Sequence, residues 1–353
     1  MSSNQYTTDV ATRHQLFIQR YGAGVAKKYV AGLKRVQSKV LAKLSENELT
    51  QVSGARLRQI NLDIDQLISG GYDKSKTAMI VELNKFALSE AEFTASMVGS
   101  ATVAEYSAAL PATNQIETAL KVKTFSPKKG QLLNIEQAVT QFGEKQSKAI
   151  KLAVTDGYLL GETNAQISSK IKDLGRVTDR QADTLARTMT NHTASIARSE
   201  TIAANSDVLE GVQWLATLDD RTTLTCAGRD GEIYPINSDY PQPPAHFNCR
   251  STLNMVVDPQ YDLGAKVTGE RPQVGSKGAG TTSAKTTFGG WLKKQPAGFQ
   301  DEYFSKFPDG DARAKLFRKG GLKIDKFTDN QGAIYSLDRL RELNPIAFAK
   351  AEI

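Results

Sequence analysis

The first hundred residues carry a helical pattern of apolar side chains that no proline interrupts. Between residues 10 and 44 the apolar positions recur every three or four residues, the spacing that places them on one face of an α-helix. These positions are Leu16, Phe17, Tyr21, Val25, Tyr29, Leu33, Val36, Val40 and Leu44. The first proline is Pro111. The pattern predicts long, paired helices, with one turn at Gly70-Gly71 and another at Pro111.

A second helical region follows the basic stretch 121–130. Its apolar face is marked by Ile135, Val139, Phe142, Ile150 and Val154, and Gly161 is predicted to end the helix. Thr163 with Gln166 and Thr178 with Gln181 match the capping box, a threonine followed three residues later by glutamine. These two caps predict one helix that ends near Gly175 and another over 179–205.

The pattern changes to short strands after residue 211. The runs 212–218, 231–236 and 251–257 are rich in β-branched and aromatic residues, and Asp230-Gly231 is a turn signal between the first two. A sheet of this size is too small to be stable alone, so we expect it to pack on the preceding helices.

These patterns together predict a mainly α fold with a small α+β unit. Residues 264–286 are rich in Gly, Ser, Thr and Lys without periodicity, which is typical of a flexible linker. The expected parts are a helical N-terminal domain with a basic arm (1–125), a second domain (126–258), the linker (259–286) and a helical C-terminal tail (287–353). The second domain would comprise helices over 130–205 and a small sheet with a Cys/His knuckle over 211–256.

The net charge of +7 is modest for 353 residues but unevenly distributed. Residues 1–60 hold ten Lys and Arg against three acidic residues, so this segment alone has the net charge of the whole chain. Such a basic segment favours contact with nucleic acid or an acidic protein surface, although a solvated helix face gives the same pattern. The candidate contact residues are Lys27, Lys28, Lys34, Arg35, Lys39, Lys128 and Lys129.

Composition also bears on the cellular compartment in which the chain folds. The polar N-terminus does not resemble a signal peptide, and no apolar run is long enough to predict a membrane span. Two cysteines make no disulfide framework, and a chain folded in the cytoplasm would keep them reduced.

One of the three histidines and both cysteines fall within a short stretch of the chain. Cys226, His246 and Cys249 have the residue types and the spacing to bind Zn²⁺ from two loops. Pro241, Pro243 and Pro244 restrict the unfolded approach loop, which lowers the entropy lost on ordering it. Two buried cysteines and a histidine bonded to the backbone would fit the same spacing, so both zinc and a metal-free site remain open.

The sequence around this cluster resembles the phage Mu F-like minor head proteins, also called phage head morphogenesis proteins. The resemblance covers about 145–256 and follows the order of the family's pattern. The matching residues are Trp214, Asp219, Arg221, Thr222, Cys226, Asp230, Gly231, Pro243, Pro244, His246, Cys249 and Arg250. The family's first cysteine corresponds to Thr223, so the resemblance implies a metal set of Cys226, His246 and Cys249. Asp230 or a water would complete it.

The resemblance implies a low-copy virion protein made in the bacterial cytoplasm and located inside the capsid near the portal. Its expected partners are the portal protein, the major capsid or scaffolding protein, and packaged DNA bound without sequence specificity. Its expected role lies in DNA packaging or ejection. Trp214, Asp219, Arg221, Gly231, Pro244 and Arg250 are interpreted as structural residues of the motif, with the arginines paired to carboxylates.

Two other classes of function are considered. A three-ligand zinc site with an open position is typical of a metal-dependent hydrolase or nuclease, with Asp230 or Glu232 as general base, or of a toxin-like phage protein. A DNA-binding regulator with a zinc knuckle is the third, but residues 211–250 hold more acidic than basic residues and make a poor phosphate surface.

Overall fold

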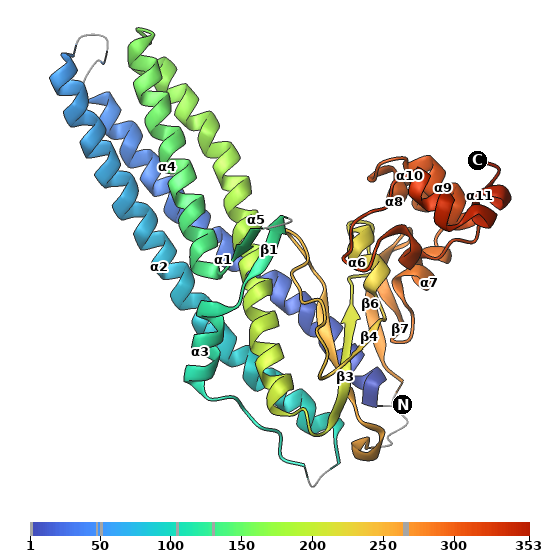
Figure 1. The fold of residues 1–353 in the computed structure, drawn as a ribbon. Helices are drawn as coiled ribbons and strands as arrows, with labels where there is room; N and C mark the ends of the chain where they lie inside the picture. The colour runs from blue at the N-terminus through green and yellow to red at the C-terminus, as the bar shows by residue number, and fades with distance from the viewer. Residues whose placement is uncertain (1–2, 47–48, 50–51, 104–105, 129–130, 264–267) are drawn as a thin grey trace.

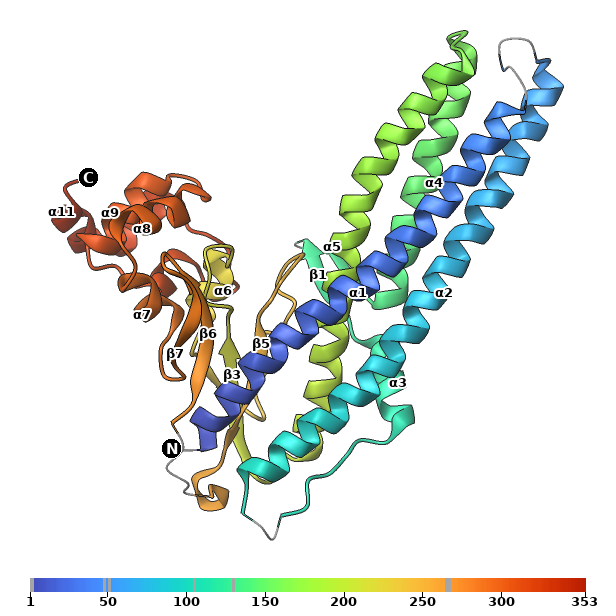
Figure 2. The same ribbon diagram turned by 180° about the vertical axis from the view of Figure 1, so that it is seen from behind.

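The protein has two helical arms that diverge from a small sheet (Figures 1 and 2). The computed structural model describes residues 3–46, 49, 52–103, 106–128, 131–263 and 268–353, and for residues 127 and 128 it describes the backbone alone. The longer arm is a helical bundle, and the shorter arm contains the C-terminal helices. We call the sheet between them, together with α6 and the loop 236–251, the joint.

The bundle confirms the prediction of long helices. Its members are α1 (Ser3–Ser45), α2 (Gly54–Ala101), α4 (Ile135–Leu159) and α5 (Asn164–Ala204). The predicted capping box of Thr163 and Gln166 begins α5. Buried apolar side chains of α1, α2, α4 and α5 share one core. Residues on both sides of position 125 contribute to it, so the predicted boundary at 125 does not separate two cores.

The turn predicted at Gly70-Gly71 is wrong, because α2 continues through both residues. Gly71 instead lies where α2 crosses α1. A Cβ on Gly71 would come within 2.3 Å of the Val36 side chain. The missing side chain is therefore a requirement of close helix packing.

The helix break predicted between Gly175 and Thr178 is also wrong. α5 runs through both positions, and a Cβ on Gly175 would overlap the Gln37 side chain of α1. Thr178 is an interior helix residue whose hydroxyl donates to the Leu174 carbonyl at 2.8 Å. The sequence signals of a helix end mark a contact between two helices here.

The basic stretch 121–130 is a connection with structure of its own. It contains the end of α3 (Thr113–Val122) and the strand β1 (Phe125–Lys128), which pairs with β2 (Gln131–Leu133). The side chain of Lys128 and the whole of Lys129 lie outside the described residues, so their predicted contact role stays a prediction.

The sheet of the joint consists of the three predicted strands. β3 (Leu209–Leu215) lies between β4 (Ile233–Pro235) and β5 (Thr252–Val257), and both pairings are antiparallel. All six residues of β5 are buried. The N-terminal end of α1 packs on β5, where Asn254 Nδ2 donates to the hydroxyls of Thr7 and Thr8 at 3.0 and 3.2 Å. The small sheet is therefore covered by the bundle, as expected.

The prediction of a flexible linker over 259–286 is wrong for its described residues. After a short 3-10 helix at Pro259–Tyr261, β6 (Glu270–Gly275) and β7 (Gly278–Ser283) form a regular antiparallel hairpin. The hairpin is attached to the joint, since Val274 N donates to the Leu218 carbonyl at 2.8 Å. Arg271 is only 2% exposed. A low-complexity composition therefore encodes an ordered hairpin.

The C-terminal residues form the predicted helices, but they do not make a free tail. The helices are α7 (Phe288–Lys293), α8 (Ala297–Ser305), α9 (Gly310–Arg318), α10 (Leu337–Leu343) and α11 (Pro345–Ala351). Their aromatic core includes Phe288, Trp291 and Phe304, and it also takes in Leu218 and Leu224 of the joint. The short arm is thus built onto the joint.

A buried ion cluster lies where the bundle meets the joint. The Glu90 side chain is fully buried in α2, with Arg198 on one carboxylate oxygen and His14 Nε2 2.6 Å from the other. Arg198 also donates to the Leu253 carbonyl of β5 at 3.3 Å. These contacts tie three helices to the sheet.

Candidate metal centre

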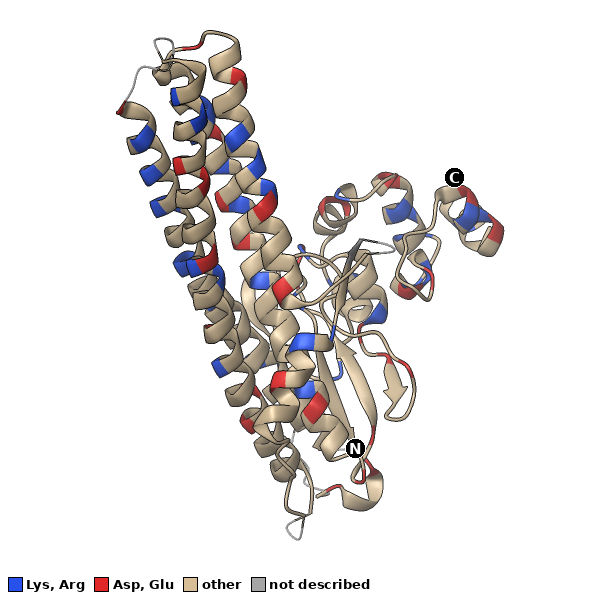
Figure 3. Ribbon diagram, turned by 60° about the vertical axis from the view of Figure 1, so that its left-hand side comes forward, with Lys and Arg blue, Asp and Glu red and all other residues tan. Residues whose placement is uncertain are grey.

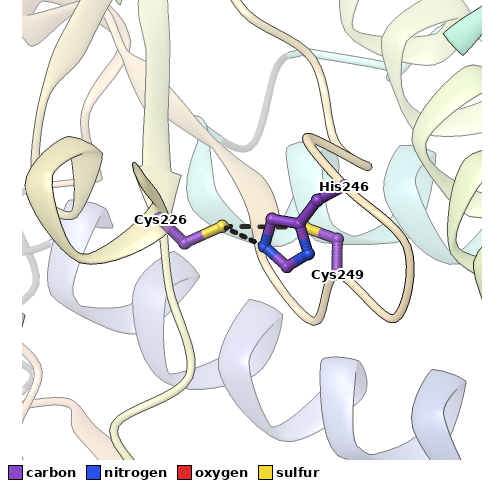
Figure 4. A group of neighbouring side chains, drawn as sticks. All are labelled: Cys226, His246 and Cys249. Atoms are coloured by element: carbon purple, nitrogen blue, oxygen red, sulfur yellow. Dashed lines mark hydrogen bonds between the residues drawn. The ribbon is translucent and has the colours of Figure 1, made fainter. Parts of the chain in front are cut away.

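The two cysteines and His246 converge in the joint, as the sequence predicts (Figure 4). Cys226 lies on α6 (Leu224–Arg229), whereas His246 and Cys249 come from the loop before β5. Cys226 Sγ is 3.2 Å from His246 Nε2 and 3.8 Å from Cys249 Sγ. All three ligand atoms lie within 4.8 Å of one another. Both cysteines are buried and His246 is half-buried.

Local hydrogen bonds fix the two segments that carry these residues. Thr223 is the N-cap of α6, and its hydroxyl accepts from Cys226 N at 3.4 Å. The loop is held by α5, where the Thr188 hydroxyl accepts from Asn248 N at 2.9 Å and Asn191 Nδ2 donates to the Cys249 carbonyl at 3.1 Å. The cluster is therefore positioned by two helices and does not depend on its own contacts alone.

The orientation of His246 directs its Nε2 toward Cys226 and Thr223. Its Nδ1 lies 2.8 Å from the Phe247 carbonyl, which can only accept, so Nδ1 carries the proton in the neutral ring. Nε2 then presents a lone pair toward Cys226. A histidine that binds zinc usually donates its other N–H to a carbonyl or carboxylate in this way.

The two thiols have different protonation behaviour. A hydrogen bond from Cys249 stabilises the thiolate of Cys226 and, against the effect of burial, lowers the pKa of Cys226 to about 7. The pKa of Cys249 is raised because its thiol donates this hydrogen bond and because it is buried. The pair therefore supplies a thiolate near neutral pH, the form in which cysteine binds metal and acts as a nucleophile.

The donor set fits a zinc ion. With Zn–S bonds of about 2.3 Å, two thiolates of a tetrahedral site stand about 3.8 Å apart. The observed separation of the two Sγ atoms is 3.8 Å. The Sγ–Nε2 distance of 3.2 Å is a few tenths shorter than the same geometry requires. Both distances from Cys226 Sγ are thus close to those of a tetrahedral zinc site.

Asp230 does not belong to this cluster, so its prediction as a metal ligand is wrong. Its carboxylate is bound in a bidentate pair by Arg271, at 2.9 and 3.0 Å. The same oxygens accept from the backbone N–H groups of Ala216 and Phe288, both at 2.6 Å. These four hydrogen bonds use the carboxylate completely, and they join the hairpin and α7 to the joint.

Thr223 stands where the resemblance places the family's first cysteine. Its hydroxyl lies 3.0 Å from His246 Nε2 and also hydrogen-bonds the Cys226 thiolate. Thr223 therefore keeps its place beside two of the three ligand atoms while it caps α6.

The motif residues predicted to be structural have structural contacts. Asp219 is buried and paired with Arg250, and Arg221 N donates to its Oδ1 at 3.1 Å. Burial opposes ionisation, but the hydrogen bonds and charge of Arg250 outweigh it and lower the pKa of Asp219. Trp214 is fully buried in the core.

The turn residues of the motif are explained by backbone geometry. Gly231 has a φ of 90°, a conformation that favours glycine, and a Cβ there would lie 2.9 Å from the Thr287 side chain. Pro244 follows Pro243 through a cis peptide bond in the loop 236–251, which carries His246 and Cys249 and is called the ligand loop.

Figure 3 shows where charged residues lie along the helices. The basic residues of α1 differ in their pairing. Lys28 pairs with Glu82 at 2.7 Å and Lys34 with Asp179 at 3.1 Å. Lys27, Arg35 and Lys39 are exposed, and none has a carboxylate partner among the described residues. Of the candidate contact residues on α1, two are therefore neutralised by carboxylates and three are unpaired within the described residues.

Arg271 is the main residue of this region that the sequence interpretation missed. It lies in the Gly- and Thr-rich stretch taken for a linker, and no spacing relates it to Asp230, which is 41 residues away in the chain. Its charge does not distinguish it in the sequence, because the same stretch holds three lysines.

The comparisons with known proteins agree with the resemblance. The family model described as Phage Mu protein F like protein matches residues 148–254. These residues form a Mu F-like segment. It runs from α4 to β5 and contains all three residues of the metal cluster.

The chain is also similar to a bacterial protein. An uncharacterised protein of Haemophilus influenzae is 30% identical over 136 residues, which is 36% of this chain and 28% of the relative. The chain thus spans little more than a quarter of that relative's length. No solved structure matches the chain significantly. Among the described residues, no helix has the length and apolar character needed to cross a membrane.

Proposed function

We propose that the protein is a minor structural protein of a tailed bacteriophage head. It is made in the bacterial host, binds the portal during procapsid assembly, and stays inside the capsid near the portal. The observation that supports this is the place of the Mu F-like segment in the fold. Residues 148–254 contain the second half of α4, all of α5, β3 and β4, and the first half of β5, so the segment that resembles head proteins connects the bundle to the joint.

The two arms suit a protein that connects partners. The long bundle and the C-terminal arm present separate surfaces on opposite sides of one joint (Figure 1). One arm would contact the portal, and the other the major capsid or scaffolding protein. A role in DNA packaging or ejection follows from this location beside the channel through which the genome passes.

The unpaired cations of α1 are proposed to face packaged DNA. Lys27, Arg35 and Lys39 lie on one helix with no carboxylate partner among the described residues, so their charge is available for phosphates. Contacts of this kind carry no sequence information, in agreement with the need to bind any packaged sequence.

The metal centre is proposed to be structural. Cys226, His246 and Cys249 would hold one Zn²⁺, which would link α6 to the ligand loop and so stabilise the joint. Thr223 leaves the fourth position without a protein thiolate. A bound water fits that position.

The hydrolase alternative loses one of its two candidate general bases. Asp230 is used by Arg271 and two backbone N–H groups, whereas Glu232 is exposed and accepts one hydrogen bond, from the Tyr234 hydroxyl at 2.6 Å. No observation favours a nuclease or toxin activity over the structural role.

The test of the proposed function is quantitative mass spectrometry of phage particles. Particles are purified on gradients, treated with nuclease and protease, and measured with the portal protein as internal standard. We expect this protein at a fixed, low ratio to portal that survives protease treatment. An abundant host protein serves as the contamination control. Absence from particles, despite expression in the same cells, would overturn the proposal.

A further inference from the structure

A second surface of the molecule lies beside the metal centre and has no part in it. It is a groove of about 490 Å³ between α4, α5, the β1–β2 hairpin and the ligand loop. It is lined by Phe125, Gln131, Leu133, Ala138, Gln141, Phe142, Lys145, Arg180, Gln181, Thr184, Leu185 and Phe247.

The floor of this groove is apolar. Leu185 and Ala138 belong to the bundle core, and Phe142 packs against that core while remaining partly exposed. Phe247 forms one wall and is 42% exposed, although it is a large aromatic residue. Leu132, on the neighbouring strand β2, is 68% exposed. Exposed apolar side chains gathered around a concave apolar floor are typical of a protein-binding site.

The charged side chains that line the groove are positive. Its lining includes Lys145 and Arg180 but neither aspartate nor glutamate. Both cations are exposed, and neither forms an ion pair with a carboxylate of the described residues. Elsewhere on the same helices other cations have partners, such as Lys151 with Asp65 and Arg187 with Asp183. The groove therefore leaves positive charge uncompensated at its rim.

We propose that this groove binds a segment of a partner protein in which a large apolar side chain stands beside carboxylates. The apolar side chain occupies the floor between Phe142, Leu185 and Phe247, and the carboxylates meet Lys145 and Arg180. Unpaired cations around an apolar pocket select acidic partners and reject basic ones. The inference does not rest on the proposed role in phage heads, because it follows from the lining of the groove alone.

The metal centre controls one wall of the groove. Phe247 lies between His246 and Cys249, two residues of the cluster, and its ring meets Phe125 edge-to-face at 6.0 Å. Because His246 and Cys249 fix the loop on both sides of Phe247, the loop holds this ring against the groove. The Cys/His cluster thereby positions a contact residue of the partner site.

The test uses peptides, because the partner is unidentified. A yeast-displayed library of random peptides is selected for binding to the full chain, and the enriched peptides are synthesised with a fluorescent label. Their affinities are measured by anisotropy for the wild type, for Phe247→Ala and for the double variant Lys145→Gln with Arg180→Gln. Ile346→Ala, at an exposed apolar residue of α11, is the control for the first variant. Lys172→Gln with Arg176→Gln, two exposed cations of α5, is the control for the second.

We expect enriched peptides that combine Phe, Leu or Trp with Asp or Glu. Phe247→Ala should weaken their binding by about tenfold, the effect of removing one aromatic side chain from the interface. The double charge variant should weaken binding by about fivefold at low salt and less at high salt. Both control variants should bind as the wild type does, and all variants should unfold at the wild-type temperature.

Three results would overturn the proposal. The first is a selection that enriches no peptide. The second is a set of peptides without acidic residues, or one that binds every variant equally well. The third is a dimer in light scattering that Phe247→Ala dissociates, because the occupant of the groove would then be a second copy of this chain.

Discussion

The far end of the bundle and the joint are held together by different forces. In the bundle, the buried side chains around Val40, Ile64 and Ile167 are apolar, and the ion pairs lie at the surface. Where the hairpin meets the joint, an ion pair is buried, since the side chains of Asp230 and Arg271 are 0% and 2% exposed. Apolar contacts tolerate gradual change, whereas a buried charge without its partner is costly. The bundle should therefore respond to mutation by degrees and the joint abruptly.

The largest effect is expected from breaking the buried pair of the joint. Asp230→Ala leaves Arg271 buried without its carboxylate and should lower the free energy of unfolding by about 3–5 kcal/mol. The measurement is urea denaturation followed by circular dichroism. The double variant Asp230→Ala with Arg271→Met is the control, because it removes the unpaired charge and should recover part of the loss. A loss below about 1 kcal/mol in the single variant would contradict the difference between the two regions.

His192 of α5, which lies against Lys123 and Phe125, should make stability depend on pH. Burial lowers the pKa of His192 to about 4, so the folded chain keeps this ring neutral while the unfolded chain protonates it near its ordinary value of 6.5. Stability attributable to His192 should therefore fall as pH falls from about 6.5 to about 4, by about 3 kcal/mol in total, and level off below.

The check is the difference in free energy of unfolding between the wild type and His192→Gln across this pH range. The variant keeps a polar side chain but does not titrate. The difference should shrink toward acidic pH, because only the wild type loses stability through His192. A constant difference from pH 7 to pH 4 would show that His192 does not titrate in this way.

A smaller, graded loss is expected in the bundle. Ile64 is fully buried among apolar side chains, so Ile64→Val should cost about 1 kcal/mol through the removal of one methylene. Urea denaturation measures this on the same scale as the variants of the joint. Leu62→Ala, at an exposed position of the same helix, is the control and should change little. A loss for Ile64→Val as large as that for Asp230→Ala would remove the contrast.

The smallest effects concern the surface of α1. The affinity for double-stranded DNA falls with salt, so log affinity against log salt has a negative slope. In Arg35→Gln with Lys39→Gln this slope should become shallower by about 0.9 for each phosphate that the variant no longer neutralises. Lys28→Gln with Lys34→Gln should change the slope less, because Glu82 and Asp179 already neutralise these lysines. Anisotropy with labelled DNA over a salt series measures both. Equal changes in the two double variants would show that pairing does not decide which cations bind DNA.

The sequence predicts the two regions unequally well. The bundle helices follow from apolar periodicity, which is local, and the capping box at Thr163 fixes where α5 begins. The prediction fails at Gly71 and Gly175, because a glycine that permits close packing looks the same in sequence as one that ends a helix. Only the position of the neighbouring helix distinguishes the two.

The joint is predicted where its signals are local. Cys226, His246 and Cys249 are recognisable from residue type and spacing, and the structure brings them together. Asp230 is misread because its partner Arg271 is distant in sequence and lies in a stretch with the composition of a linker. A contact between remote charged residues leaves no periodic pattern, so neither the hairpin nor the true role of Asp230 is visible in one sequence.

A zinc ion that links α6 to the ligand loop is tested most directly by native mass spectrometry of the purified chain with zinc. We expect one zinc per chain, absent in Cys226→Ser, and a lower unfolding temperature when a chelator removes the ion. The variant Ser238→Ala, at an exposed residue of the ligand loop, should keep the zinc. A metal-free mass in the presence of zinc, together with an unfolding temperature that a chelator does not change, would contradict the claim.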